Sequence, residues 1–225
     1  MKHLSIIIPI LNEATQMPEL FAHLLPYQRV GCEIIFADGG SDDGSVMLAK
    51  VAGYSVVSAR RGRALQMNAG AEAATGEVLL FLHADTRLPQ GALHHIEAAF
   101  VSGKHDWGRF DVCIAGRPFM LRVISRMMNW RSRLTGIATG DQAMFVRRAA
   151  FRQLQGFPEQ PLMEDIELSK RLKSLSRPAC LTQCVTTSGR RWETRGVWRT
   201  ILLMWCLRLQ YWLGADAEQL ARQYR

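Results

Sequence analysis

Three short segments near the start of the chain consist almost entirely of Ile, Leu, Val and Phe, and each ends in polar residues. They are LSIIIPILNE, ending at Asn12 and Glu13, CEIIFAD, ending at Asp38, and EVLLFLHAD, ending at Asp85. Continuous apolar residues without alternation are typical of strands in a parallel sheet that is buried on both faces. Because ligands of open α/β sheets bind beyond the carboxyl ends of the strands, we expect the three polar ends to converge at one edge.

Helical spacing of apolar residues follows in several later segments. A helix is expected from Met17 to Leu24, with Asn12 and Thr15 as candidate N-caps. ALQMNAGAEAA and the amphipathic run IELSKRLKSL predict two more, and residues 117–134 and 198–213 a further pair. GDQAMFVRR predicts a turn followed by a strand. These elements predict an α/β fold with a mostly parallel sheet and helices on both faces.

The length of 225 residues and the hydrophobic content of 48% fit one domain with a large core. We expect a single domain over residues 1–225, made of two parts (1–88 and 89–192) and a C-terminal helical tail (193–225). The apolar run Leu4 to Leu11 is short, is broken by Pro9 and lacks a small-residue cleavage site. It therefore predicts a strand and not a signal peptide, and a cytoplasmic protein.

Five cysteines form an odd set without CxxC spacing, so neither a disulfide framework nor a zinc site is predicted. Reduced thiols are the favoured interpretation, and a redox or metal pair of Cys180 and Cys184 is the alternative. The net charge of +8 and the pI near 9.7 call for an anionic partner, which could be a nucleotide diphosphate, an anionic lipid or a nucleic acid.

The placement of the charge helps to choose among these partners. Arg60, Arg61 and Arg63 surround Gly62 just before a predicted helix. Free backbone N–H groups and arginine forks at such a position suit a diphosphate, and a solvated basic turn is the alternative. Nucleic acid is disfavoured, because the aromatic residues follow no RNP-like pattern and the arginines lie on helix faces and at phosphate turns.

The order of motifs resembles the inverting glycosyltransferases of family 2, which have the GT-A fold, over nearly the whole chain. IIIPILNE is similar to the opening strand of that family, Asp38 with GGSDDGS to its base-reading aspartate, and Leu82-His83-Ala84-Asp85 to its DxD metal motif. Met163-Glu164-Asp165 is similar to the ED motif, and Arg190-Arg191-Trp192 to the late (R/Q)xxRW element. HADT, GDQA, MEDIELS and SGRRWE also resemble the bacterial branch of selenodomain-associated transferases.

The resemblance implies a nucleotide-binding half over residues 1–88 and an acceptor and catalytic half over residues 89–192. In the nucleotide site that it implies, Asp38 binds the base and Glu13 the ribose. For Asp38 a turn or cap role is the alternative, and for Glu13 an exposed acid at a helix start. Asp85 is the implied metal ligand, for Mg²⁺ or Mn²⁺, since hard cations prefer carboxylate oxygen. His83 replaces the first acid of the metal motif, so we expect less protein ligation than usual; it is a ligand, a phosphate donor or simply a packed histidine. The full set of expected nucleotide-binding residues is Pro9, Asn12, Glu13, Asp38, Arg61, Arg63, Asn68, His83, Ala84 and Asp85.

For catalysis, the resemblance implies that Asp165, with Glu164 beside it, takes the proton from the acceptor hydroxyl. Both acids precede an amphipathic run and so lie in the first turn of a helix, where acids also occur purely as stabilisers. The turn of Gly140, Asp141 and Gln142 is expected to line the acceptor side. Arg190, Arg191 and Trp192 are expected to close over the diphosphate, with a basic aromatic surface loop as the alternative.

Two basic, apolar helical segments, residues 117–134 and 198–213, indicate where the acceptor comes from. Arginines interrupt both, so neither is predicted to span a membrane. Such helices can lie in a membrane interface, or they pack as core helices or in a homodimer. The first interpretation implies a peripheral protein at the inner face of the cell membrane and a lipid-linked acceptor.

The expected function is therefore the transfer of a sugar from a nucleotide-diphosphate sugar, UDP-sugar being the first choice, to a hydroxyl acceptor with inversion. One rival is a sugar-1-phosphate nucleotidyltransferase, whose GxGTRxxP-like stretch is not found after the first strand. A second rival is a degenerate protein that binds nucleotide sugars without transfer. Against it, Asp38, Asp85 and Asp165 are all present.

Overall fold

Four parallel strands form the first half of the sheet in the computed structural model, which describes residues 4–224. They are β1 (Leu4–Ile10), β2 (Glu33–Asp38), β3 (Ser55–Ser58) and β4 (Val78–Phe81), in the spatial order β3-β2-β1-β4. Because β1 pairs in parallel with both β2 and β4, the carboxyl ends of these three strands lie at one edge, as predicted. Residues 1–3 and 225, the ends of the predicted domain, lie outside the described range.

The second half of the sheet is mixed. β5 (Thr86–Arg87), β6 (Trp107–Ala115), β7 (Phe145–Arg147) and β8 (Ala179–Ser188) extend the described sheet to eight strands in the order β3-β2-β1-β4-β7-β6-β8-β5. β7 is antiparallel to β4 and β6, and β5 to β8, whereas β6 and β8 are parallel. The prediction of a mostly parallel sheet is thus confirmed.

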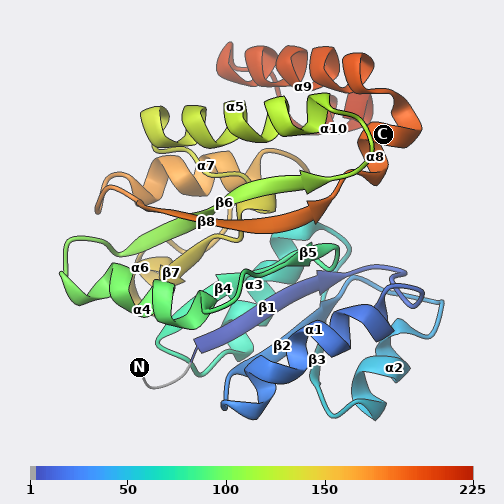
Figure 1. Cartoon of the computed structure of the whole chain (residues 1–225), viewed down its shortest axis with the longest axis vertical. Helices are drawn as coiled ribbons and strands as arrows, with labels where there is room; N and C mark the ends of the chain where they lie inside the picture. Colours follow the sequence, from blue (N-terminus) through green and yellow to red (C-terminus); the bar gives the residue numbers. More distant parts are fainter. Residues whose placement is uncertain (1–3, 225) are drawn as a thin grey trace.

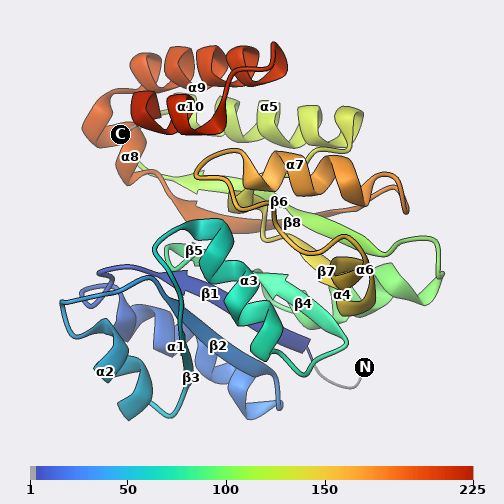
Figure 2. The same ribbon diagram turned by 180° about the vertical axis from the view of Figure 1, so that it is seen from behind.

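Helices cover both faces of the sheet, as predicted (Figures 1 and 2). On one face, α1 (Met17–Arg29), α2 (Ser45–Val51), α4 (Ala92–Val101) and α5 (Met120–Thr135) contribute to one apolar core. On the other, α3 (Arg63–Ala73), α6 (Arg148–Gln153) and α7 (Glu164–Leu172) contribute to a second core. In β1, Ile6 and Ile8 belong to the first core and Ile7 to the second. Alternate side chains of a strand point to opposite faces, which explains why this strand has no polar alternation.

The start of α1 differs from the prediction. Its N-cap is Gln16, which makes no side-chain cap hydrogen bond, and neither Asn12 nor Thr15 caps it. The Asn12 side chain instead accepts a hydrogen bond from the backbone N–H of Asp42 at 2.9 Å, and Asn12 itself has a left-handed φ of 57°. Asn12 therefore joins the loop after β1 to the loop after β2.

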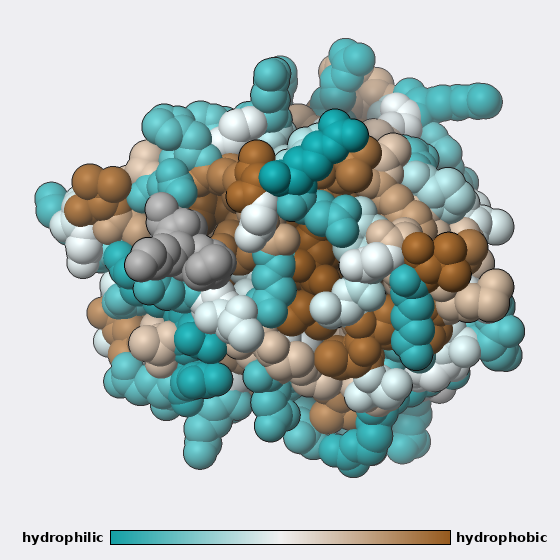
Figure 3. Space-filling model, turned by 90° about the horizontal axis from the view of Figure 1, so that it is seen from below, coloured by the Kyte–Doolittle hydropathy of each residue, from teal (hydrophilic) through white to brown (hydrophobic). Residues whose placement is uncertain are grey.

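The C-terminal part contains η1 (Gly140–Gln142), α8 (Arg190–Arg195), α9 (Val197–Trp212) and α10 (Ala217–Tyr224). The predicted helices over residues 117–134 and 198–213 are confirmed as α5 and α9. α9 lies at the end of the molecule farthest from α1 and α2 (Figure 1). On the opposite end, seen in Figure 3, hydrophobic residues are interspersed with hydrophilic ones. Within residues 4–224, no helix is both long enough and apolar enough to cross a bilayer.

The five cysteines are free thiols, as predicted. Burial raises the pKa of Cys32 to about 11 and that of Cys184 to about 12. A thiol with a raised pKa is a weak nucleophile and a weak metal ligand, so these two cysteines have the properties of packed residues.

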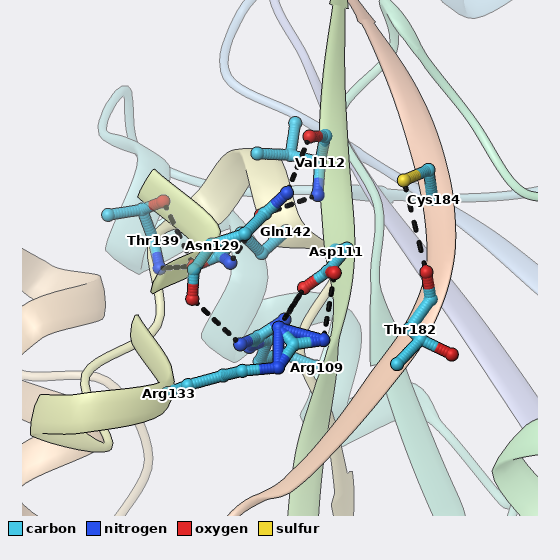
Figure 4. Close-up of polar contacts among 9 residues, drawn as sticks. All are labelled: Arg109, Asp111, Val112, Asn129, Arg133, Thr139, Gln142, Thr182 and Cys184. Carbon is cyan, nitrogen blue, oxygen red and sulfur yellow. Dashed lines mark hydrogen bonds and ion pairs between the residues drawn. The ribbon is translucent and has the colours of Figure 1, made fainter. Parts of the chain in front are cut away.

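Asn129 and Ser125 of α5 hold the otherwise unpaired edge of β6, and Figure 4 shows the contacts of Asn129. Asn129 accepts a hydrogen bond from the Val112 N–H at 2.9 Å and donates one to its carbonyl at 3.0 Å. One turn earlier, Ser125 accepts one from the Ile114 N–H at 2.9 Å. Four helical residues rise about 6 Å and two strand residues about 6.6 Å, so this spacing matches and orients α5 along β6.

A buried ion pair strengthens this anchor (Figure 4). Arg109 of β6 is fully buried, pairs with Asp111 and donates to the Asn129 carbonyl at 3.3 Å. Arg133 of α5 donates two hydrogen bonds to the same Asp111 carboxylate, at 2.8 and 2.9 Å. Charge-assisted, two-point contacts of this kind are geometrically specific, so they set the position of the helix.

Replacing Asn129 tests the anchor. Asn129→Ala leaves the Val112 N–H and C=O without partners, so the free energy of unfolding measured with urea should fall by about 2–3 kcal/mol. Arg126→Ala, on the exposed side of the same helix, should change it by less than about 0.5 kcal/mol. Equal effects of the two substitutions would show that Asn129 does not anchor α5.

Candidate active site

One cavity of about 1490 Å³ opens at the carboxyl ends of β1 and β4 and continues between α5 and α9. Most of the predicted site residues line it: Pro9, Glu13, Arg61, Arg63, His83, Ala84, Asp85, Gly140, Asp141, Glu164, Asp165, Arg190, Arg191 and Trp192. Asn12, Asp38, Asn68 and Gln142 do not line it. Residues far apart in the sequence therefore share one cavity.

Glu164 and Asp165 form the first turn of α7, as predicted, and both face the cavity. The Asp165 carboxylate accepts hydrogen bonds from the backbone N–H of Gly140 at 2.8 Å and of Ile166 at 2.7 Å. Glu164 is only 3% exposed, and its carboxylate lies 3.8 Å from the Arg63 guanidinium. Burial raises the pKa of both acids; the Asp165 charge adds to this effect at Glu164, and Arg63 opposes it at both.

His83 and Asp141 form a second polar pair in the cavity wall, with His83 Nδ1 3.4 Å from Asp141 Oδ1. Burial acts to raise the pKa of Asp141, but the hydrogen bond and charge of His83 and the charges of Arg63 and Arg191 hold it below its usual value. The imidazole packs directly on Gly140, where an added Cβ would come within 2.6 Å of the ring. Gly140 is therefore the residue that lets His83, η1 and Asp165 approach one another.

Asp85 and Glu13 both line the β1 and β4 side of the cavity. Burial raises the pKa of Glu13; Arg190 opposes this shift, and the charge of Asp85 adds to it. No cluster of three or more His, Cys, Asp or Glu side chains with metal-binding geometry occurs in residues 4–224. One or two carboxylates together with substrate phosphates are a common way to hold Mg²⁺. The residues present therefore fit a divalent ion that is shared with a diphosphate.

The predicted residues outside the cavity wall make structural contacts. Asp38 is buried and accepts hydrogen bonds from the backbone N–H groups of Gly40 and Ser41, as a turn aspartate does. Asn68 exchanges two hydrogen bonds with the backbone of Phe157, which joins α3 to the segment before α7. Gln142 is fully buried and forms a capping box with Thr139. A direct contact of these three with a ligand stays a prediction.

The predicted closing element is the helix α8, next to the C-terminal helix. The Arg191 guanidinium stacks on the Tyr224 ring at 3.6 Å and donates to the Tyr224 carbonyl at 2.9 Å. Trp192 is half-buried against the first apolar core. Whether the element moves on ligand binding stays a prediction.

The cavity is also lined by three residues that no sequence motif marks as site residues: Arg131, Arg208 and Tyr224. For Arg131, helical spacing could have indicated the site, because this residue lies three and four residues after Met128 and Met127, which line the same cavity. Arg208 follows the fully buried Leu207 of α9. The contact of Tyr224 with Arg191 depends on chain reversal between α9 and α10, and no local pattern predicts it.

The sequence itself identifies the family. Residues 5–154 match the profile of "Glycosyl transferase family 2", and the chain therefore belongs to this family. A search of curated proteins found no match. The resemblance on which the sequence analysis relied is thus confirmed for the family; the resemblance to the selenodomain-associated branch stays a prediction.

Solved glycosyltransferase structures share the fold. S. aureus TarS residues 1–349 are similar with a TM-score of 0.67 and 18% identity, over 84% of this chain and 61% of TarS 1–349. The mannosyltransferase PcManGT from Pyrobaculum calidifontis, in complex with GDP-Man and Mn²⁺, has a TM-score of 0.66 and 18% identity, over 98% of this chain and 68% of its own. Glucosyl-3-phosphoglycerate synthase from Mycobacterium tuberculosis, with Mn²⁺ and UDP, has a TM-score of 0.58 and 17% identity, over 81% and 70%. The GT-A fold is therefore shown, and the chain spans about three fifths of TarS 1–349.

The raised pKa of Glu164 predicts a pH-dependent stability. Because the folded state holds this proton more tightly than the unfolded state, stability is lost as pH rises from the unfolded pKa toward the folded one. Glu164→Gln has no proton to release at this position, so its stability does not fall for this reason. Its Tm relative to the parent should therefore rise by about 2 °C or more between pH 4 and pH 7. A difference in Tm that stays constant or falls over this range would contradict the assigned shift.

Proposed function

We propose that the chain transfers a sugar from a nucleotide-diphosphate sugar to an acceptor hydroxyl, with inversion at the anomeric carbon. The observation that carries the proposal is the placement of Asp165, a half-buried carboxylate with a raised pKa, in the same cavity as the strand ends and arginines that suit a donor. A base is most effective when its pKa lies near the working pH, and desolvation moves Asp165 in that direction.

The donor occupies the side of the cavity formed by β1, β4 and the start of α3. Arg61, Arg63 and Arg190 supply forks for the diphosphate, and Glu13 binds the ribose. Asp38 lies behind the cavity wall at the end of β2, and we assign it to the base only by its resemblance to the base-reading aspartate of the family. Similar structures are described in complex with UDP-GlcNAc and with GDP-Man; we keep a UDP-sugar as the first choice. Asp85, with Glu13 near it, holds Mg²⁺ or Mn²⁺, which when bound neutralises charge on the leaving diphosphate.

The chemistry is one displacement. Asp165 accepts the proton of the acceptor hydroxyl while that oxygen forms a bond to the anomeric carbon from the side opposite the diphosphate. The bond between the anomeric carbon and the diphosphate breaks, and its electron pair leaves on the diphosphate oxygen. The charge of Asp141 opposes a second negative charge nearby, so it adds to the effect of burial in keeping the pKa of Asp165 high.

Two rival functions, nucleotidyl transfer and donor binding without transfer, can be compared with sugar transfer. The family assignment favours sugar transfer over nucleotidyl transfer. A degenerate protein that binds the donor without transfer would have the same nucleotide-binding part of the cavity but no functional general base. Whether Asp165 acts as a base therefore distinguishes sugar transfer from binding alone.

Asp165→Asn separates chemistry from binding. A thermal-shift screen with Mn²⁺ first selects the nucleotide sugar that stabilises the parent most. Donor hydrolysis, in which water replaces the acceptor hydroxyl, should then fall by roughly two to four orders of magnitude in Asp165→Asn while donor affinity is retained. Glu164→Gln should reduce it less.

The control for this comparison is the folded state of each variant, so the Tm of each variant must be close to that of the parent. A variant Asp165→Asn that binds donor and hydrolyses it at the parent rate would move the base elsewhere, with Asp141 the first residue to examine. A parent without turnover on any donor it binds would favour the degenerate function.

The proposal includes contact with an anionic membrane surface. Trp198, Leu202, Trp205, Leu209 and Trp212 form one stripe along α9 and are 57–76% exposed. α9 and α5 contain no Asp or Glu, and they carry arginines throughout. An exposed apolar stripe on a basic helix suits an anionic bilayer by both hydrophobicity and charge.

Flotation with vesicles tests this contact. The protein should float with vesicles of equal parts phosphatidylglycerol and phosphatidylcholine at low salt, and salt should release it. Trp212→Ser, outside the cavity, should weaken flotation, whereas Val101→Ser, exposed on α4, should not. Failure to float at low salt would favour a core or homodimer role for the stripe.

A further inference from the structure

The cavity changes character beyond Asp165. Its far walls consist of apolar side chains, with Val123, Met127 and Met128 from α5 and Ile201, Met204 and Trp205 from α9. Its volume of about 1490 Å³ exceeds the roughly 300–1,000 Å³ of a typical ligand pocket. The cavity therefore has room for a second, largely apolar ligand next to the donor.

Two arginines stand in this apolar part with unused hydrogen-bond donors. Nε and Nη2 of Arg131 and Nε of Arg208 are buried and have no acceptor among the described protein atoms. Burial lowers the pKa of Arg131, and the charge of Asp165 opposes this shift. A buried cationic donor without a partner is costly, so these guanidinium groups point to an anionic group of a ligand.

No acid of the two helices can serve as that group, because α5 and α9 contain no Asp or Glu. The acids that line the cavity are Glu13, Asp85, Asp141, Glu164 and Asp165. None of them makes a described ion pair with Arg131 or Arg208, since the described pairs of Glu164 and Asp141 are with Arg63 and His83. The Asp165 charge acts on Arg131 without a described direct contact, so the unused donors are free to bind an anionic group of a ligand.

The apolar part also continues to the surface. Trp198, Leu202, Trp205 and Leu209 line the cavity and belong to the exposed stripe of α9 as well. An apolar chain can thus pass from a bilayer into the cavity without crossing a polar wall. A free sugar or a soluble acidic peptide would have no use for this continuity.

We infer that the acceptor is an anionic amphiphile, with its apolar chain between α5 and α9 and a phosphate-like headgroup on Arg131 and Arg208. This inference rests on the proposed function and names the class of acceptor. The headgroup contact places the acceptor hydroxyl at Asp165, which takes its proton as the new bond to the sugar forms and the diphosphate leaves. Arginine forks match the oxygens of phosphate in pairs, so the contact also orients the acceptor.

Binding of decyl phosphate to the whole chain tests the inference without knowledge of the natural acceptor. Titration below its micelle concentration should shift the tryptophan emission to the blue and saturate, because Trp130, Trp198 and Trp205 line the cavity. Decanol and inorganic phosphate, each with half of the recognised chemistry, should bind at least ten-fold more weakly. Decyltrimethylammonium, which has the same chain and the opposite charge, should also bind at least ten-fold more weakly than decyl phosphate.

Substitutions assign the binding to the two arginines. Arg131→Gln and Arg208→Gln should each raise the Kd for decyl phosphate about ten-fold or more. Arg126→Gln on α5 and Arg199→Gln on α9, both exposed and outside the cavity wall, should leave it within about two-fold. Arg131→Lys, which keeps the charge but not the fork, should fall between these limits.

The outcomes separate this inference from the proposed function, because calorimetry on the same samples measures nucleotide binding. Nucleotide binding without saturable decyl phosphate binding would overturn the amphiphile site alone. Equal affinities of the parent, Arg131→Gln and Arg208→Gln, or tight binding of decanol, would overturn the anionic contact. Decyl phosphate binding without nucleotide binding would support the amphiphile site and contradict sugar transfer.

Discussion

Asp141, Glu164 and Asp165 bring three carboxylates into the wall of one cavity, where burial acts to raise the pKa of each. Like charges that lie close together and are partly removed from water are costly unless nearby groups compensate them. The cost is greatest at Glu164, which is 3% exposed, and smaller at Asp141, whose side chain is 47% exposed. Here the compensation comes from the Gly140 N–H, from the start of α7 and from Arg63 and His83. The fold must therefore bring α3, α7, η1 and the end of β4 to one place, and most of its architecture serves this requirement.

The same requirement explains a strained residue. Met163, directly before the two acids, has a left-handed φ of 66°, which costs a residue with a side chain about 1 kcal/mol or more. Its side chain is buried with Leu162, Leu207 and Leu220 in a small cluster that includes α9 and α10. Packing of the C-terminal helices thus holds the backbone turn that aims Glu164 and Asp165 into the cavity. The helix α9 and the two proposed catalytic acids are therefore parts of one packed unit.

The family profile ends at residue 154, whereas both acids, α8 and α9 lie beyond it. The profile therefore includes the strand ends of β1, β2 and β4 and also α5, whereas the proposed base and α9 are supported by the structure alone. Charged groups dominate the cavity wall near β1, β4 and α3, and apolar groups dominate it between α5 and α9. Much of the sheet and the catalytic turn was predictable, because β1, β2 and β4 are apolar on both faces and α7 begins with its acids. β3 was missed, since it has only four residues with half-exposed or exposed side chains. The cap at Asn12 was wrong because a loop 30 residues later uses its side chain, and Arg131 was missed as a site residue because only tertiary packing separates it from its neighbour Arg133.

The charged side of the cavity should bind a nucleoside diphosphate together with a divalent ion. Calorimetric titration with UDP and GDP, with Mn²⁺ and after its removal, measures this binding. We expect saturable binding of at least one nucleotide that needs the metal, weakened about ten-fold or more by Asp38→Ala and by Asp85→Ala and unchanged by Glu72→Ala on the exposed side of α3. Binding of neither nucleotide with metal present, or an affinity that both Asp38→Ala and Asp85→Ala leave unaltered, would contradict this expectation.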